Sequence, residues 1–351
     1  MKRSKCFKSL LFVSLLLLVM ASLMGCASKP ASGGAQGSAA GGSNGKTDNG
    51  ASGAGDAKKQ YKIGVAAQGL SHEFIKALAE SMQSKAKELH VNLQIMDSED
   101  KIETQLSQVD SLVSQKVDAL ILNSVDFVGS GPAVDKAKKA GIPVVEVITF
   151  TKNENYDVFV GTDPKQSGVM MGDYLAKALN GKGKVALLQG QIGHSAEITR
   201  GAGLKESLFD KYPDVKLVTQ QTANWNRDEA LRISEDWLQR FPDINAIAAQ
   251  NDEMAMGALQ AVKASGRKDI IVCGIDGIPD ALQAVKDGRL GSTILDNVTS
   301  EGKRAVEVAV GLIEGKKFNK KRTGRLRPDY EGQCRPVSKK IKQKISSQPI
   351  I

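Results

Sequence analysis

The sequence has few of the residue patterns that support catalysis or metal binding. Its 351 residues include three histidines, and His72, His90 and His194 do not have the spacing of a zinc site. The turn AAQGLSHEF, after the first expected strand, lacks the G-x-G-x-x-G motif of dinucleotide-binding enzymes, and no Walker lysine motif occurs. No nucleophile-elbow motif surrounds Ser195. We therefore expect no metal, no cofactor and no enzymatic activity.

Aromatic residues are also scarce, at 5% of the chain, and a helix-turn-helix pattern is lacking. Seven basic residues gather late in the chain: Lys316, Lys317, Lys320, Lys321, Arg322, Arg325 and Arg327. Without an aromatic platform, we interpret this segment as a solvated edge and not as a site for nucleic acid or anionic lipid. The net charge is +9, or +5 without residues 1–25, which hold four basic residues and no acid. We expect no nucleic-acid partner.

The first 26 residues have the pattern of a bacterial lipoprotein export signal. Four basic residues precede an apolar stretch from about Ser9 to Met24, and small residues lead to Gly25-Cys26. This stretch is short for a membrane span. We expect residues 1–25 to be removed and Cys26 to carry lipid, so that the protein is exported to the outer face of the cell membrane or the periplasm and contacts the membrane through lipid only. An uncleaved anchor helix is the alternative, and the Gly-Cys pair argues against it.

Residues 26–59 differ in composition from everything that follows. They are rich in Gly, Ser, Ala and Asn and have almost nothing to bury. Such a segment behaves as a flexible coil, and about 30 residues of coil have a root-mean-square reach of roughly 30 Å. We expect a flexible linker between the membrane and the folded part.

The four cysteines do not predict a disulfide framework. Cys6 is in the export signal and Cys26 is the lipidation site, while Cys273 falls in the apolar run IIVCGI and is expected to be a core thiol. The exported location allows a disulfide between Cys273 and Cys334, although a pairing cannot be deduced from sequence. We expect the two to be unpaired.

From Tyr61 onward, short apolar runs alternate with amphipathic helical segments. The expected strands are residues 61–67, 91–97, 118–123, 143–148, 184–189, 215–220, 246–250, 270–275 and 291–295. The expected helices are residues 72–89, 102–114, 133–140, 166–179, 196–209, 228–241, 253–264, 279–287 and 300–314. Apolar strands separated by helices indicate parallel sheets covered on both faces, and nearly 300 residues exceed one hydrophobic core. The expected fold class is α/β, with two doubly wound parallel-sheet lobes.

Two expected strands end on asparagine shortly before an acidic residue, in VDALILNSVD and INAIAAQNDE. Ligands of doubly wound sheets bind outside the carboxyl ends of the strands, where the strand order reverses. If the lobes face each other, Asn123 and Asn251 contact one cleft from opposite walls. Helix capping is the simpler alternative for both amides. We favour a ligand role for Asn251 and assign the cap of the following helix to Asp252.

Several motifs resemble the ribose-binding type of periplasmic substrate-binding protein. They are AQNDEMAMGAL, VCGIDGIPDAL and KDGRLGSTI, together with GIPVV and LLQGQIGHSAEITRGAGL. The resemblance extends from Tyr61 to about Gly315. It implies two lobes, joined by a three-strand hinge, that close around a sugar and hand it to an ABC importer. On this basis we expect an N-terminal lobe of residues 60–162 and 297–326, a C-terminal lobe of residues 163–296 and 327–340, and a tail of residues 341–351.

The resemblance also implies a ligand site. The positions assigned to it are Gln68, His72, Phe74, Asn123, Thr149, Arg200, Trp225, Asn251, Asp276 and Asp296. Amides, an arginine and carboxylates suit vicinal hydroxyls, and Phe74 opposite Trp225 would pack on the two faces of a sugar. Structural alternatives exist: His72 as a helix cap, Asp276 in an Asp-Gly turn, Trp225 as hinge packing and Arg200 in a surface ion pair.

The sequence departs from ribose binders within this site. The replacements are Ile148 and Thr149 for an Asp-Arg pair, Ile275 for an aromatic residue, His72 for an amide and Asp296 for a glutamine. They leave Arg200 against Asp276 and Asp296, which disfavours an anionic ligand. We expect a small neutral polyol other than ribose: another monosaccharide, a cyclitol or an amine-bearing polyol.

These features predict a monomeric, lipid-anchored solute-binding protein that captures a small polyol, foremost a monosaccharide, by hinge closure and delivers it to an ABC permease. The alternative is a sensory protein that presents its loaded form to a chemoreceptor or sensor kinase, and the sequence does not separate the two. Transcription repressors with related lobes carry an N-terminal DNA-binding helix pair, whereas this chain has a lipoprotein signal there.

Overall fold

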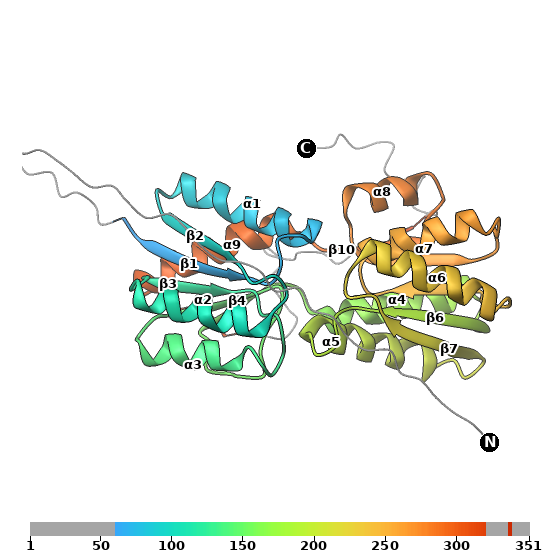
Figure 1. Ribbon diagram of the computed structural model, residues 1–351, viewed down its shortest axis with the longest axis horizontal. Helices are drawn as coiled ribbons and strands as arrows, with labels where there is room; N and C mark the ends of the chain where they lie inside the picture. The colour runs from blue at the N-terminus through green and yellow to red at the C-terminus, as the bar shows by residue number, and fades with distance from the viewer. Residues whose placement is uncertain (1–59, 321–335, 339–351) are drawn as a thin grey trace, which may run out of the picture. The chain divides into compact units, whose positions relative to one another are not determined.

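The computed structural model describes residues 60–320 and 336–338, which form one parallel and one mainly parallel β-sheet with helices on both faces (Figure 1). The predictions for the export signal, the lipidated Cys26, the linker and Cys334 lie outside the described residues. Among the described helices, none combines the length and the apolar character that a membrane span requires.

The first sheet has five parallel strands in the order β2-β1-β3-β4-β5. The strands are β1 (Lys62–Ala67), β2 (Asn92–Asp97), β3 (Ala119–Leu122), β4 (Val144–Val147) and β5 (Val158–Val160). The helices around it are α1 (Glu73–Glu88), α2 (Ile102–Ser114), α3 (Gly131–Lys139) and α9 (Val298–Ile313). Figure 1 shows α9, near the end of the sequence, beside strands from its first half.

Alternation along the strands builds two cores around this sheet. Ile63 and Val65 pack with α1 and α9, whereas Ala66 packs with α2 and α3. All four residues of β3 and of β4 are buried, as expected for parallel strands covered on both faces.

The second sheet has six strands in the order β11-β10-β9-β8-β6-β7, with β11 antiparallel to its neighbour and the others parallel. The strands are β6 (Gly183–Gln189), β7 (Val215–Thr222), β8 (Ala246–Ala249), β9 (Ile271–Asp276), β10 (Ser292–Leu295) and β11 (Pro336–Ser338). The helices are α4 (Pro164–Ala178), α5 (Ser195–Leu204), α6 (Arg227–Arg240), α7 (Asp252–Ala264) and α8 (Pro279–Lys286). Helices α6, α7 and α8 cover one face, and α4 and α5 the other.

The prediction of an α/β fold with two doubly wound sheets is confirmed, with small differences. Strand β5 was not expected, because three residues are too short for a periodic pattern. The helix expected at residues 196–209 ends in a π-helical turn, η1 (Lys205–Phe209). We refer to β1–β5 with their helices as lobe 1, and to β6–β11 with theirs as lobe 2.

The chain crosses between the sheets after β5 and again after β10. The Thr162 hydroxyl, in the first crossing, donates a hydrogen bond of 3.1 Å to Asp296 in the second. The predicted lobe boundaries at 162/163 and 296/297 fall in these two connections. The third predicted crossing, at 326/327, lies outside the described residues, and the three-strand hinge therefore stays a prediction.

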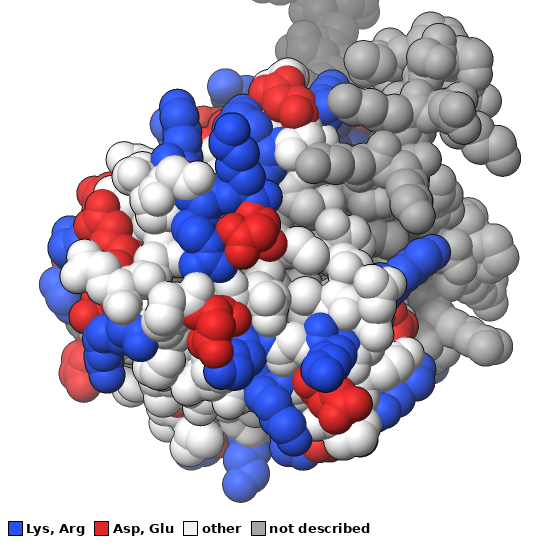
Figure 2. Space-filling model, turned by 90° about the vertical axis from the view of Figure 1, so that its right-hand side faces the viewer, with Lys and Arg blue, Asp and Glu red and all other residues white. Residues whose placement is uncertain are grey.

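The face of lobe 2 seen in Figure 2 carries basic and acidic side chains side by side. Many form ion pairs, such as Arg240 with Asp236 at 3.0 Å and Lys165 with Glu206 at 2.7 Å. Exposed pairs of this kind contribute little to stability. The mixture differs from the one-sided basic charge of a nucleic-acid-binding face.

Candidate functional site

A cavity lies where the carboxyl ends of the two sheets meet. Its free volume is about 50 Å³, which is smaller than the roughly 300–1,000 Å³ of most small-molecule sites. The lining residues are Gln68, His72, Phe74, Ile75, Ile148 and Thr149 from lobe 1, and His194, Ala196, Arg200, Trp225, Asn251 and Asp276 from lobe 2. Strand order reverses between β1 and β3 and between β6 and β8, and Gln68 and Asn251 follow strands at these points.

The structure brings most of the predicted site residues together. Eight of the ten line the cavity: Gln68, His72, Phe74, Thr149, Arg200, Trp225, Asn251 and Asp276. Asn123 and Asp296 do not. Their local hydrogen bonds explain the difference.

Asn123 is fully buried beneath the cavity wall, so the expectation that it faces the cleft is wrong. Its Oδ1 accepts from the backbone N–H of Gln68 at 3.1 Å. Its Nδ2 donates to the Val147 carbonyl at 3.2 Å and to the Thr149 hydroxyl at 2.9 Å. The side chain therefore joins the ends of β1, β3 and β4 and positions Gln68 and Thr149.

Asp296 lies in the second crossing between the sheets, where one oxygen accepts from Thr162. It contacts Glu301 and does not line the cavity. The pKa of Asp276 is raised by burial first, and the charge of Asp296 adds to this effect. The prediction that Asp296 contacts a ligand directly is therefore not supported by its position.

The cap of α7 is Asn251 and not, as expected, Asp252. Asn251 caps α7, because its Oδ1 accepts from the backbone N–H of Met254 at 2.9 Å, and its Nδ2 donates to the Trp225 carbonyl at 3.3 Å. Asp252 is not the cap. It is fully buried, and its Oδ2 accepts from the backbone N–H groups of Gly277 and Ile278, at 2.7 and 3.0 Å. Asn251 lines the cavity with its amide already engaged.

Arg200 and Asp276 form a buried ion pair in the wall of lobe 2. Arg200 Nη2 lies 3.3 Å from Asp276 Oδ1, and Nη1 donates to the Gln250 carbonyl at 2.6 Å. The guanidinium also lies 5.8 Å from the centre of the Trp225 ring. Burial places Arg200 inside the site, so the alternative of a surface ion pair is wrong.

A chain of side-chain hydrogen bonds crosses from lobe 1 to lobe 2. His72 Nε2 lies 2.8 Å from Asp100 Oδ2, and Gln68 Nε2 donates to Asp100 Oδ1 at 3.1 Å. Gln68 Oε1 lies 2.8 Å from His194 Nε2. His72 occupies the N-cap position of α1, but its side chain does not make the capping bond.

Three lining residues were not predicted from the sequence: Ile75, Ala196 and His194. The first two are apolar and carried no pattern that separates a cavity wall from a core. His194 carries a polar signal, but its partner Gln68 is 126 residues away in the chain.

Backbone strain concentrates around the cavity. Ile148, Trp225 and Asp276 line it and have φ angles of 62°, 61° and 129°. Positive φ is unusual for residues other than glycine and is an outlier for a β-branched one. Strain of this kind gathers at functional sites, where the surrounding structure holds it.

Buried carboxyl groups dominate the electrostatics of lobe 2 next to the cavity. Burial raises the pKa of Asp276 well above its ordinary value, against the lowering effect of Arg200. Burial likewise raises the pKa of Asp252 to about 7, although Thr293, Ile278 and Gly277 donate to it. The pKa of His194 falls to about 3, because of burial first and the Arg200 charge second. The imidazole is therefore neutral at pH 7.

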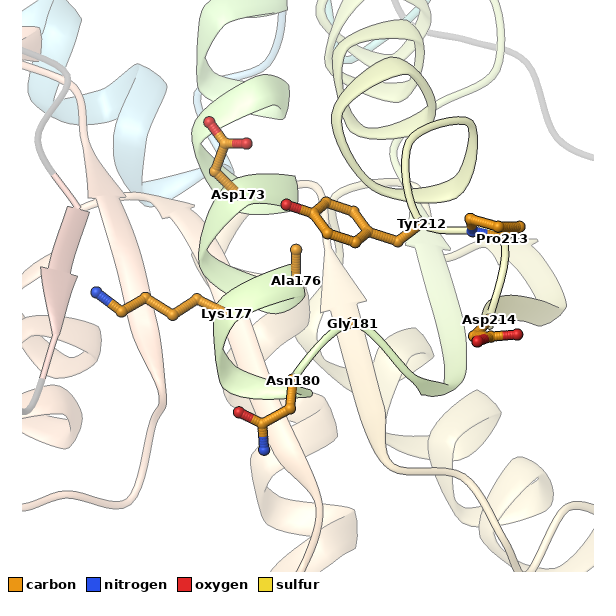
Figure 3. A pocket seen from close by; sticks show the side chains of 8 residues that line it. All are labelled: Asp173, Ala176, Lys177, Asn180, Gly181, Tyr212, Pro213 and Asp214. Carbon is orange, nitrogen blue, oxygen red and sulfur yellow. The ribbon is translucent and has the colours of Figure 1, made fainter.

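A second hollow opens at the opposite end of the lobe 2 sheet, before β6 and β7 begin (Figure 3). Its wall includes Asp173, Lys177 and Tyr212. It is a wide, shallow surface depression of ordinary exposed groups, away from the carboxyl ends of the strands. We therefore place the candidate site in the cavity between the lobes. Within the part of the chain that the structure describes, no group of three or more His, Cys, Asp or Glu residues is placed to hold a metal ion.

Residues 63–317 match the family model described as periplasmic binding protein domain. The chain belongs to this family. It is 40% identical over 255 residues to the xylitol-binding protein of Mycolicibacterium smegmatis, covering 72% of each chain. It is 36% identical over 263 residues to the ribose import binding protein of Bacillus subtilis, covering 75% of this chain and 85% of that one.

Solved structures of periplasmic binding proteins share the fold. An ABC transporter solute-binding protein of Bacillus halodurans with bound myo-inositol has a TM-score of 0.71 at 34% identity, over 74% of this chain and 91% of that one. The fructose-binding periplasmic domain of a hybrid two-component system has a TM-score of 0.74 at 27% identity, over 82% and 93%. The family consists of solute-binding proteins, and its match confirms the predicted fold class and the expectation that the chain is not an enzyme.

Proposed function

We propose that the protein is the solute-binding component of an ABC transporter, and that it binds a small neutral polyol between its two lobes. The observation that carries this proposal is a cavity lined from both lobes, with Phe74 in one wall and Trp225 in the other. Relatives named for binding xylitol and ribose, and a solved structure holding myo-inositol, support the same class of ligand.

The chemistry of the wall suits hydroxyl groups. Aromatic rings pack on the C–H-rich faces of sugars and cyclitols. Arg200 supplies donors and Asp276 an acceptor, and vicinal hydroxyls can use both. Trp225 Nε1 and Arg200 Nε are buried without a partner in the protein, and a ligand oxygen would satisfy each of them.

Charge argues for a neutral ligand. Arg200 is paired with Asp276, and the burial of Asp276 already raises the pKa of this carboxyl. An anionic ligand would add a further negative charge beside the Asp276 carboxylate, and the cavity lining contains no Lys or Arg besides Arg200 to balance it. A neutral polyol adds no charge to this wall.

The wall of lobe 1 argues for a ligand other than ribose. Ile148 and Thr149 stand where the resembling ribose binders have a charged pair. The Thr149 hydroxyl is occupied, because it donates to the Ser124 carbonyl at 2.9 Å and accepts from Asn123. This wall therefore offers no charged side chain at these two positions, and a monosaccharide or cyclitol with fewer polar contacts there is favoured.

Contacts between the lobes fit a hinge that closes over the ligand. The Phe127 N–H donates to the Gly193 carbonyl at 2.9 Å, and the Phe150 N–H donates to the Ser195 hydroxyl at 3.1 Å. Gln191 Nε2 donates to the Asp100 carbonyl at 3.3 Å. A ligand that touches both walls would favour this closed arrangement, because its contacts are complete only there.

We also propose that residues 1–25 are removed on export, that Cys26 is lipidated and that residues 26–59 serve as a flexible linker. This follows from the sequence pattern alone. Labelling of cells with radioactive palmitate tests it. The wild-type chain should incorporate label, and the Cys26→Ser variant should not.

Calorimetric titration tests the proposed ligand class. The chain from residue 26 onward, carrying C26S, is titrated with xylitol, D-ribose, myo-inositol and an anionic control such as gluconate. At least one neutral polyol should bind, and gluconate should bind far more weakly. Binding of gluconate alone, or of none of the four, would argue against the proposal.

A sensory role is the second candidate, and the resemblance to the fructose-binding domain of a two-component system favours it. Uptake of the radiolabelled solute by cells separates the two functions. Deletion of the protein should abolish uptake if it serves a transporter. Normal uptake with a lost transcriptional or motile response would favour the sensory role.

A further inference from the structure

The hydrogen-bond chain across the cavity determines which ring nitrogen of His194 carries the proton. The chain starts at Asp100. Its Oδ2 lies 2.8 Å from His72 Nε2, and its Oδ1 accepts a hydrogen bond from Gln68 Nε2 at 3.1 Å. It continues through Gln68 Oε1 to His194 Nε2 at 2.8 Å. Asp100 has a positive φ of 57° and follows Glu99 at 50°, so two successive residues adopt a strained conformation where the chain starts.

The direction of each bond follows from the chemistry of Asp100. A carboxylate accepts hydrogen bonds and cannot donate them, so the Gln68 group that faces it must be the NH₂. The amide oxygen of Gln68 must then face His194. Because an amide oxygen only accepts, His194 Nε2 must carry the proton of this 2.8 Å bond.

A neutral imidazole has one N–H, so His194 Nδ1 is left with a lone pair. This atom is buried and without a hydrogen-bond partner in the protein, and the whole residue is only 3% exposed. His194 lines the cavity, and its ring packs edge-on against Trp225 with centroids 5.2 Å apart. Buried acceptors in native proteins are rarely left unpaired, and the missing donor is therefore expected from a ligand.

We infer that His194 is a specificity-determining residue, whose Nδ1 accepts a hydrogen bond from a hydroxyl of the bound solute. Gln68 and Asp100 are positioning residues that act through it by fixing the tautomer. The inference rests on the proposed function and adds a requirement to it: the solute must present a donor at the edge of the Trp225 ring. A polyol with hydrogen or a methyl ether at that position would leave Nδ1 unpaired and would be rejected.

Two substitutions test the roles of the two ring nitrogens of His194 separately. His194→Gln places an amide nitrogen near the Nε2 position, which keeps the bond to Gln68, but has no acceptor at the Nδ1 position. His194→Asn places its amide near Nδ1 and has nothing at Nε2. Affinity is measured by calorimetry with whichever of xylitol, D-ribose and myo-inositol binds the wild-type mature chain most tightly.

The H194Q variant should lose affinity by about tenfold or more, since a ligand hydroxyl would be buried without its acceptor. The H194N variant should lose less. Binding by H194Q within about twofold of wild type, with an unchanged melting temperature, would overturn the inference.

Nitrogen NMR of the free mature protein tests the tautomer without any ligand. The His194 ring should show a protonated Nε2 and an unprotonated Nδ1 at neutral pH. In Asp100→Asn, position 100 gains a donor, Gln68 can turn over, and a mixture of tautomers should appear. A purely structural role for Asp100 would leave the tautomer unchanged.

The two kinds of failure are distinguishable. If the wild-type protein binds none of the three polyols, the proposed function is contradicted, and the NMR spectrum alone decides the tautomer. A protonated Nδ1 in the free wild-type protein would overturn the inference whatever the protein binds.

Discussion

Trp225 is held in place by its surroundings more than by its own conformational preference. Its φ of 61° lies in the left-handed region, and the preceding Asn224 has 49°. The Asn251 amide holds its carbonyl, and the ring meets His194 edge-on and Arg200 at 5.8 Å. Gly190 allows the ring to lie close, because a Cβ there would come within 2.0 Å of it. These contacts fix a flat apolar surface in the cavity wall.

Removing this surface should weaken solute binding. Trp225→Ala should lower affinity by about 10- to 100-fold, because burying a large apolar side chain against the solute contributes about 1.5–3 kcal/mol. Calorimetric titration with the best-binding polyol measures the change. Trp225→Phe is the control, since it keeps a ring and should retain most of the affinity. Equal binding by W225A and wild type would show that Trp225 is only hinge packing.

Asp252 has an unusual position for a titratable residue. It is fully buried, and burial raises its pKa to about 7 despite the hydrogen bonds from Gly277, Ile278 and Thr293. Its ordinary pKa is 3.8. Between these two values the folded protein binds a proton that the unfolded chain releases. The contribution of Asp252 to stability is therefore complete at acidic pH and is lost as the pH rises through about 7.

Comparison with Asp252→Asn tests this effect together with the influence of the Asp252 charge on the pKa of buried Asp276. From pH 5 to pH 8, the unfolding free energy of the wild type should fall by about 1–3 kcal/mol relative to that of D252N. Denaturant unfolding at several pH values gives the difference. The comparison is needed because His194, whose pKa is lowered to about 3, changes the stability with pH in the opposite direction. Its contribution to the unfolding free energy is present in both proteins and cancels in the difference. A pH-independent difference would contradict the assignment.

At the scale of elements, α6 and α7 begin in the same way but differ in what their caps touch. Asn226 caps α6 by accepting from the Glu229 N–H, and Asn251 caps α7 by accepting from the Met254 N–H, both at 2.9 Å. Asn251 alone also donates to Trp225 and lines the cavity. Asn226 therefore serves as a control for Asn251, because it makes the same capping bond without lining the cavity.

Alanine at either cap should cost about 1 kcal/mol of unfolding free energy, because one backbone N–H of the helix loses its acceptor. N251A should in addition weaken polyol binding several-fold by releasing the Trp225 backbone, whereas N226A should leave affinity unchanged. Thermal unfolding and calorimetric titration of both variants provide the test. An equal effect of the two on affinity would contradict a role for Asn251 in the site.

Much of this organisation could be predicted from the elements of the sequence. The apolar runs predicted the positions of the strands, because parallel strands covered on both faces need a continuous buried segment, as in β3 and β4. The cap of α7 was assigned to the wrong neighbour. Asn251 and Asp252 are both good capping residues, and only the partners of Asp252, which lie 25 to 41 positions away, decide between them.

At the scale of the whole molecule, the site depends on contacts between distant segments. Arg200 and Asp276 could be placed together by resemblance to a family, whereas the Gln68–His194 bond between lobes could not, because neither residue shows a pattern that points to the other. Asn123 was expected at the ligand because it ends a strand as well as by resemblance, and Asp296 was expected there by resemblance alone. They instead support the wall and the crossing.

The central claim is that the lobes close over a polyol in the cavity between them. Small-angle X-ray scattering of the chain from residue 26 onward, carrying C26S, with and without a saturating concentration of the best-binding polyol, tests it most directly. The radius of gyration should decrease when the polyol binds, and Trp225→Ala at the same concentration should show a smaller decrease. An unchanged radius in the wild type, at a concentration where calorimetry shows full binding, would contradict the account.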